Sequence, residues 1–150
     1  MNKYVNTYWV VEIPKYTIGM FVMLNILSII MYSGGTYFNN ANLGYSMEFN
    51  FLSDLGRTVS FSNNNNFISS FLFNSSLVLS GFVFIMFFYK IQYIFQNIKL
   101  NYFIKIATIF GICGGLSLAG VGIAPSDVYF NLHIFCATWL FRFFFIAALM

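Results

Sequence analysis

Charged side chains are scarce in this sequence. Only 7% of its 150 residues are Asp, Glu, Lys or Arg, whereas soluble domains carry roughly 25%. Hydrophobic residues make up 59% of the chain, which excludes disorder and leaves few polar side chains to cover a water-exposed surface. A very apolar soluble domain is the alternative. We predict an all-α integral membrane protein, because lipid accepts apolar side chains on the outside of a fold.

Several functional signatures are also missing. No basic cluster with interleaved polar residues occurs, which argues against a nucleic-acid partner. The sequence has no nucleotide-binding loop, serine-nucleophile elbow, paired-histidine zinc helix or haem attachment motif. Its two cysteines, Cys113 and Cys136, lie in apolar segments, where small hydrophobic side chains at helix interfaces are the expected role. The sequence therefore names no reaction, and whether the protein is an enzyme stays open.

Four apolar segments are long enough to cross a bilayer, for which about 20 residues suffice. They cover residues 16–32, 67–89, 106–124 and 132–150. The fifteen residues before the first segment are typical of an interfacial lead-in, and they argue against the alternative of a cleaved signal peptide. The last segment has no polar tail, so we expect this chain to be part of a longer protein. The prediction is a bundle of four transmembrane helices.

The charges are divided unevenly between the two sides of this bundle. One side receives five lysines and Glu12; the lysines are Lys3, Lys15, Lys90, Lys99 and Lys105. The other side receives Glu48, Asp54, Arg57 and Asp127, mostly within the long polar loop 33–66. Positive charge in short loops stays in the cytoplasm. We therefore predict a multi-pass membrane protein with its N-terminus in the cytoplasm and loop 33–66 outside.

Two patterns of small or polar residues predict how the segments pack. Small residues recur at intervals of four, which lets two helix backbones approach closely; they are Ala107, Gly111, Gly115 and Ala119. The segment 67–89 carries polar or small residues near one face: Ser69, Ser70, Asn74, Ser76, Ser80 and Gly81. These side chains either hydrogen-bond to other helices or form the wall of a polar cavity. Within the long loop, apolar residues of 48–57 predict a short amphipathic helix lying in the membrane interface.

Three residues on the outer side are candidates for acid–base or metal chemistry. They are Asp54, Asp127 and His133, and carboxylate with imidazole suits zinc or another divalent ion. Each also has a structural alternative. Asp54 would pair with Arg57, Asp127 or the neighbouring Ser126 would cap the next helix, and His133 would be a polar anchor at the interface.

Arg142 is the most unusual residue, because it falls near the middle of the last apolar segment. A charge there normally faces a partner or water. The four segments contain no acid, so its partner would be a backbone carbonyl, a polar residue such as Asn74, an anionic ligand, or a residue beyond this chain. Snorkelling to the surface is the alternative. Asn74, Arg142 and Arg57 are therefore the candidate binding residues.

Three stretches give the chain a family resemblance across residues 15–150. They are Phe51-Leu52-Ser53-Asp54-Leu55-Gly56, Phe73-Asn74-Ser75-Ser76-Leu77 with Ser80-Gly81, and Gly120-Val121-Gly122-Ile123-Ala124-Pro125-Ser126-Asp127 followed by His133. Together they resemble the multi-pass membrane family called domain of unknown function 998. The resemblance implies a multi-pass protein of the bacterial inner membrane with a six-helix fold, of which this chain would be the first four helices. It implies no established activity, and Arg142 has no counterpart in the family pattern.

The functional prediction is a polar pocket, open to the outer face, that binds a lipid or a small molecule, or serves a structural or transport-like role. The alternative is a membrane-embedded, metal-dependent hydrolase acting on lipids, with Asp54, Asp127 and His133 around the metal. No cofactor is predicted outside that alternative. The bilayer is the expected partner, and the sequence does not predict an oligomeric state.

Overall fold

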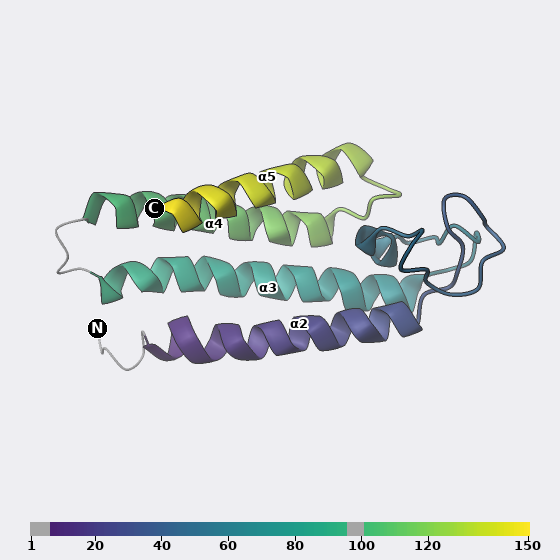
Figure 1. Ribbon diagram of the computed structural model, residues 1–150, viewed down its shortest axis with the longest axis horizontal. Coiled ribbons are helices and arrows are strands. Elements are labelled where there is room, and N and C mark those ends of the chain that lie inside the picture. The colour runs from purple at the N-terminus through teal and green to yellow at the C-terminus, as the bar shows by residue number, and fades with distance from the viewer. Residues whose placement is uncertain (1–6, 96–100) are drawn as a thin grey trace.

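The computed structural model describes residues 7–95 and 101–150. Within these residues the fold is all-helical. Its long helices are α2 (Ile13–Ile30), α3 (Phe67–Ile94), α4 (Asn101–Ile123) and α5 (Phe130–Leu149), as Figure 1 shows. Two short helices, η1 (Tyr8–Glu12) and η2 (Leu52–Gly56), complete the described elements. Four helical segments of this part of the chain are long and apolar enough to span a membrane, which confirms the predicted helical membrane protein.

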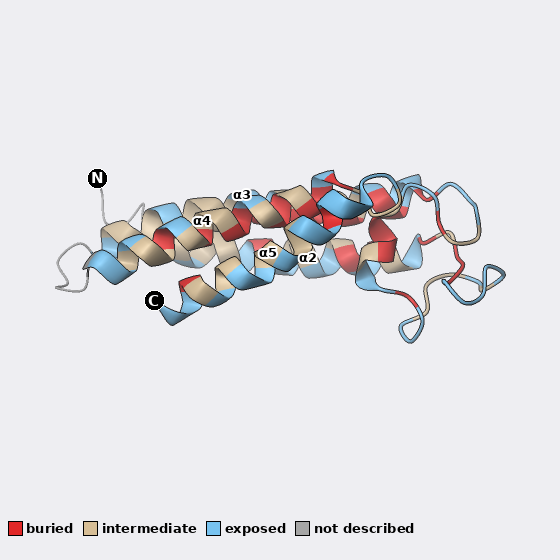
Figure 2. Cartoon of the chain, turned by 90° about the horizontal axis from the view of Figure 1, so that it is seen from above, coloured by how far each residue is buried: buried red, intermediate tan, exposed pale blue. Residues whose placement is uncertain are grey.

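Each long helix packs against its neighbour in sequence: α2 on α3, α3 on α4, and α4 on α5. Figure 1 shows them running alongside one another, with the irregular chain of residues 31–66 gathered at one end. We call this the loop end, and it also holds the connection 124–129. In Figure 2 the buried positions lie mainly where helices meet and in the long loop, whereas the outward surfaces are exposed. Large apolar side chains such as Phe71, Phe82 and Ile109 cover those surfaces, as contact with lipid requires.

The helices are longer than predicted at the end opposite the loop end. The first spanning segment begins at Tyr8, because η1 continues directly into α2. Residues 8–15 are therefore helical and continuous with the first spanning segment. The π-turn precedes Pro14, which has no N–H to donate, and the Ile13 amide donates to Tyr8 five residues back. Lys90 likewise lies inside α3 and Lys105 inside α4, while Lys3 and Lys99 lie outside the described residues.

The small residues of α4 face α3, as their spacing predicts. A methyl group at Gly81 of α3 would lie 2.6 Å from the carbonyl oxygen of Gly115 and 2.7 Å from the amide nitrogen of Ala119. Such distances are well inside van der Waals contact, so only glycine at position 81 allows this approach. The two backbones therefore touch near the middle of the bundle.

A polar seam joins α2 to α3. Ser28 in α2 donates its hydroxyl to the carbonyl oxygen of Ser69, at 2.8 Å. Further along, the Asn25 amide donates to Ser76 Oγ at 3.2 Å and to its own helix at the Phe21 carbonyl. These bonds confirm that part of the polar face of residues 67–89 holds helices together.

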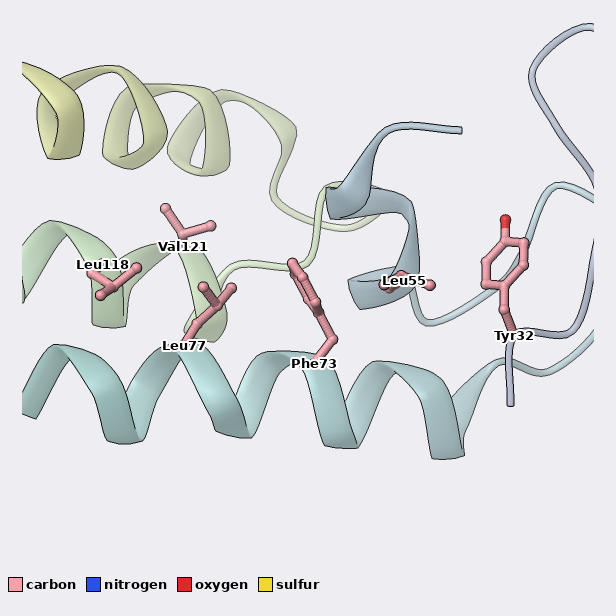
Figure 3. Close-up of a cluster of buried hydrophobic side chains, with 6 residues drawn as sticks. All are labelled: Tyr32, Leu55, Phe73, Leu77, Leu118 and Val121. Carbon is pink, nitrogen blue, oxygen red and sulfur yellow. The ribbon is translucent and has the colours of Figure 1, made fainter. Parts of the chain in front are cut away.

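The short helix η2 differs from the predicted interfacial helix. It spans five residues, and it is tucked against the first turns of α3 with Leu55 completely buried. Figure 3 shows Leu55 beside Phe73 in the buried apolar cluster at this end of the bundle. Phe51 remains 78% exposed. The apolar residues of 48–57 therefore do not share one face, since Leu55 is buried and Phe51 is exposed. Asp54, a charged residue of the same stretch, is buried as well.

Candidate functional site

A pocket of about 560 Å³ opens at the loop end between the long loop and the beginning of α5. We call it the loop-end pocket. Its lining comes from two separate parts of the chain: Tyr37, Phe51, Ser53, Asp54, Arg57 and Phe61 from the loop, and Ser126, Phe130, His133, Ile134 and Ala137 from the last connection and α5. A cavity of this size matches the range of ligand sites in proteins, roughly 300–1,000 Å³.

The pocket combines polar groups with an apolar wall. Phe130, His133, Ile134 and Ala137 fall at the spacing that places residues on one helix face, so α5 lines the pocket over about two turns. The polar groups come from Ser53, Asp54 and Arg57 in the loop, together with Ser126 and His133. Ile134 and Ala137 follow one and two turns further along α5, away from the loop end. The pocket is therefore suited to a molecule with one polar and one apolar part.

Side chains of α3 hold η2 in place beside the pocket. The carbonyl oxygen of Gly56 accepts hydrogen bonds from the Ser70 hydroxyl at 2.9 Å and the Asn74 amide at 3.0 Å. The carbonyl of Leu55 accepts from Ser69 and from Asn66, which itself is buried. The last carbonyls of a helix lack partners within the helix, and here α3 supplies them. These serines and amides fix the backbone that presents Asp54 and Arg57.

Asp54 is buried at the start of η2. Its Oδ2 atom accepts from the backbone N–H of Phe51 at 2.8 Å and from the Asn50 amide at 3.2 Å. Burial raises the pKa of this carboxyl, although the two hydrogen bonds and the charge of Arg57 offset part of the effect. The predicted ion pair with Arg57 is absent, because Glu12–Lys15 is the only pair within 4.0 Å in the described residues.

Asp127 joins the connection before α5 to the long loop. Its carboxylate accepts hydrogen bonds from the backbone N–H groups of Thr58 and Val59 and from the Thr58 hydroxyl, at 2.6–3.1 Å. Partial burial by itself raises the pKa of Asp127, but these hydrogen bonds outweigh it and the pKa lies below its usual value. The predicted helix cap is wrong, since Tyr129 occupies the N-cap of α5. We call this contact the Asp127 latch.

His133 lies one turn into α5 and is 7% exposed. Its Nδ1 atom lies 2.7 Å from the carbonyl oxygen of Ala124, which can only accept a hydrogen bond. Nδ1 therefore carries the proton. This bond orients the ring, and Nε2 is the nitrogen left for a ligand in the loop-end pocket.

Arg57 is the cation of the loop-end pocket. Its guanidinium carbon lies 4.1 Å from the centre of the Phe61 ring, and its Nε–H donates to the carbonyl of Val59 at 3.1 Å. The ring stacking and the Nε bond orient the guanidinium, and its terminal N–H groups have no partner in the described residues. Planar guanidinium groups bind carboxylate and phosphate with two parallel hydrogen bonds.

The other two candidate binding residues lie elsewhere. Asn74 donates to the Gly56 carbonyl and to Ser70, and thus positions η2 without lining the loop-end pocket. Arg142 is exposed on α5, and its guanidinium lies 5.1 Å from the centre of the Trp139 ring. Among the residues that the structure describes, Arg142 has no hydrogen bond or ion pair, and its suggested contact with Asn74 is not formed.

The three catalytic candidates are only partly brought together. Asp54 and His133 line the same pocket, whereas the Asp127 carboxylate is hydrogen-bonded to Thr58 and Val59. No group of three His, Cys, Asp or Glu side chains in residues 7–95 and 101–150 could hold a metal ion. The donor set that the hydrolase alternative requires is therefore not assembled here.

Sequence reasoning missed several residues of the site. No sequence motif marks the amides of Thr58 and Val59 or the aromatic rings of Tyr37 and Phe61. One usable signal was present: Phe130, His133, Ile134 and Ala137 have the spacing of a single helix face, which marks where α5 meets the loop.

No family model, curated protein or solved structure matches this chain. The resemblance to the domain of unknown function 998 family remains a prediction from three short stretches. The fold and the site are therefore described from the structure alone: four helices that can span a membrane, with a pocket where the long loop meets α5.

Proposed function

We propose that this protein binds a lipid or a similar amphipathic molecule in the loop-end pocket, at the outer face of the bacterial inner membrane. The observation that supports this best is the composition of the pocket. Arg57, Ser126 and His133 supply polar contacts, and Ile134 and Ala137 of α5 supply an apolar wall. Since α5 is a membrane-spanning helix, that wall continues towards the hydrocarbon core. A lipid can thus enter with its polar end in the pocket and its chains in the bilayer.

The orientation is part of this proposal. The described ends of the helices opposite the loop end carry Lys15, Lys90 and Lys105, whereas Asp54 and Asp127 lie at the loop end. Positive residues retained in the cytoplasm would leave the loop end on the other side.

The proposal can be tested with phospholipids that carry a photoactivatable group in the acyl chain. Purified protein in nanodiscs is irradiated, and the labelled peptides are identified by mass spectrometry. We expect labelling to concentrate on residues 130–137 of α5. Ala137→Trp fills the apolar wall and should reduce labelling there by roughly fivefold or more, since bulk added to a site excludes the ligand it was shaped for.

Ala148→Trp is the matched control, because Ala148 is exposed on the same helix and does not line the pocket. That variant should label like the unmodified protein. Labelling spread evenly over the exposed surfaces of all four helices, unchanged by Ala137→Trp, would contradict a lipid site at the loop end.

A further inference from the structure

The loop-end pocket contains a cation and a carboxylate that are not paired with each other. Both Arg57 and Asp54 line it, yet no nitrogen–oxygen distance of 4.0 Å or less joins them. Buried charges in proteins are usually paired with a group of opposite sign. Their separation leaves each available for a group of opposite sign on a ligand.

Arg57 offers donors for an anion. Its Nε–H is used by the Val59 carbonyl, and the Phe61 ring supports one face of the guanidinium, so the terminal N–H groups remain for a ligand. A phosphate group matches them in charge and in geometry. The hydroxyls of Ser53 and Ser126 line the same pocket and add neutral donors.

Asp54 offers an acceptor for a cation with N–H groups. The side chain is only 5% exposed, and both of its hydrogen bonds are made to Oδ2. Oδ1 has no partner in the described residues and is not sealed from solvent. Asp54 lines the pocket, so an ammonium group bound there can donate a charge-assisted hydrogen bond to Oδ1.

We infer that the ligand is a phospholipid with a primary ammonium on its headgroup, of the phosphatidylethanolamine type. This inference rests on the proposed function. Its phosphate binds Arg57 and its ammonium donates to Asp54. A purely anionic headgroup would meet the Arg57 charge but face repulsion from Asp54. A choline headgroup carries the same charges, but its quaternary nitrogen has no N–H to donate to a carboxylate oxygen.

The test compares headgroups on identical photoactivatable acyl chains. Phosphatidylethanolamine, its N,N-dimethyl derivative, phosphatidylcholine and phosphatidylglycerol are each added in small amount to phosphatidylcholine nanodiscs that contain the protein. We expect phosphatidylethanolamine to label residues 130–137 roughly fivefold more than phosphatidylcholine or phosphatidylglycerol, because the charge-assisted bond to Asp54 is specific to it. Labelling should fall as methyl groups replace ammonium hydrogens. This series needs no variant, so it does not depend on any mutant folding.

Two substitutions then assign the contacts. Asp54→Asn keeps an oxygen that can accept from Phe51, and it should abolish the preference for phosphatidylethanolamine while total labelling persists. Arg57→Gln should lower labelling by all four lipids, since each carries a phosphate. Thermal melting of each variant verifies that the helical bundle is intact.

The outcomes separate the two proposals. Equal labelling of the pocket by all headgroups, or a preference that survives Asp54→Asn, would overturn the assignment of the headgroup while the lipid site stands. Absence of labelling at residues 130–137 with every lipid would overturn both. Free O-phosphoethanolamine that competes as well as the lipid at equal concentration would show that a soluble ligand, and not a lipid, is the occupant.

Discussion

At the scale of single residues, Asp127 joins the two parts of the chain that line the pocket. Its carboxylate accepts from the amides of Thr58 and Val59 and from the Thr58 hydroxyl. Arg57 directly precedes these amides, so the latch also fixes the backbone from which the cation of the pocket extends. A hydrogen bond to a charged acceptor is stronger than one to a neutral acceptor, and the Asp127 carboxylate accepts several.

We expect Asp127→Asn to loosen the loop without unfolding the bundle. An amide retains one acceptor oxygen but turns a donor towards the amides of the loop, so the latch should lose on the order of 1–2 kcal/mol. Limited proteolysis near residues 57–60 should become faster, and the melting temperature should fall slightly. Glu48→Gln is the control, because Glu48 is an exposed acid of the same loop. Equal proteolysis of the two variants would argue against the latch.

The latch should also depend on pH. The pKa of Asp127 is lower in the folded protein than the usual value of 3.8, so the folded state favours the ionised form. Its contribution is complete above that usual value and is lost as the pH falls through the lowered pKa. The difference in melting temperature between the unmodified protein and Asp127→Asn should therefore shrink on acidification. Asp54 acts with the opposite sign, because its raised pKa makes stability fall as the pH rises through it.

At the scale of elements, the contact between α3 and α4 brings two helix backbones together. The backbone at Gly81 lies against that of Gly115 and Ala119. Helices in lipid associate through such close packing, since the bilayer supplies no hydrophobic force between them. Added volume at this contact must push the two helices apart.

Gly81→Val should therefore destabilise the protein by about 1–3 kcal/mol, the usual effect of overpacking. Gly19→Val in α2 is the matched control, because a methyl group there would meet nothing within 4 Å. Thermal melting in detergent compares the two. Similar melting temperatures for both variants would show that the α3–α4 contact is less tight than described.

The sequence predicted the helices well and the loop poorly. The four spans and the small-residue stripe follow from composition and spacing, which act over a few neighbouring residues. The position of η2 depends on single bonds between distant residues, such as Ser70 with Gly56 and Asp127 with Thr58. Nothing in the local pattern of residues 48–57 indicates that Asp54 and Leu55 are buried while Phe51 is exposed.

At the scale of the whole molecule, the two ends of the bundle differ in kind. One end has the loop 31–66 and the pocket, and the lysines of the described helices lie towards the other. In a membrane these ends face different compartments.

Single cysteines would establish which compartment the pocket faces. In a protein with Cys113 and Cys136 replaced by alanine, a cysteine at Asn64 should react with an impermeant maleimide on intact cells. One at Lys105 should react only after the cells are opened. Both side chains are exposed, and Lys105 lies in the first turns of α4, at the end opposite the loop end. The reverse pattern would place the pocket in the cytoplasm.

The Asp127 latch has a consequence for the order in which the protein matures. Asp127 lies 69 residues after Thr58, so the loop emerges from the ribosome well before its partner is synthesised. The first two spanning helices can insert and form their polar seam before Asp127 binds the loop. Asp127 reaches the loop end with the connection that follows the third spanning helix, α4, and α5 then adds the apolar wall of the pocket. A chain stalled before the fourth helix inserts would therefore lack that wall.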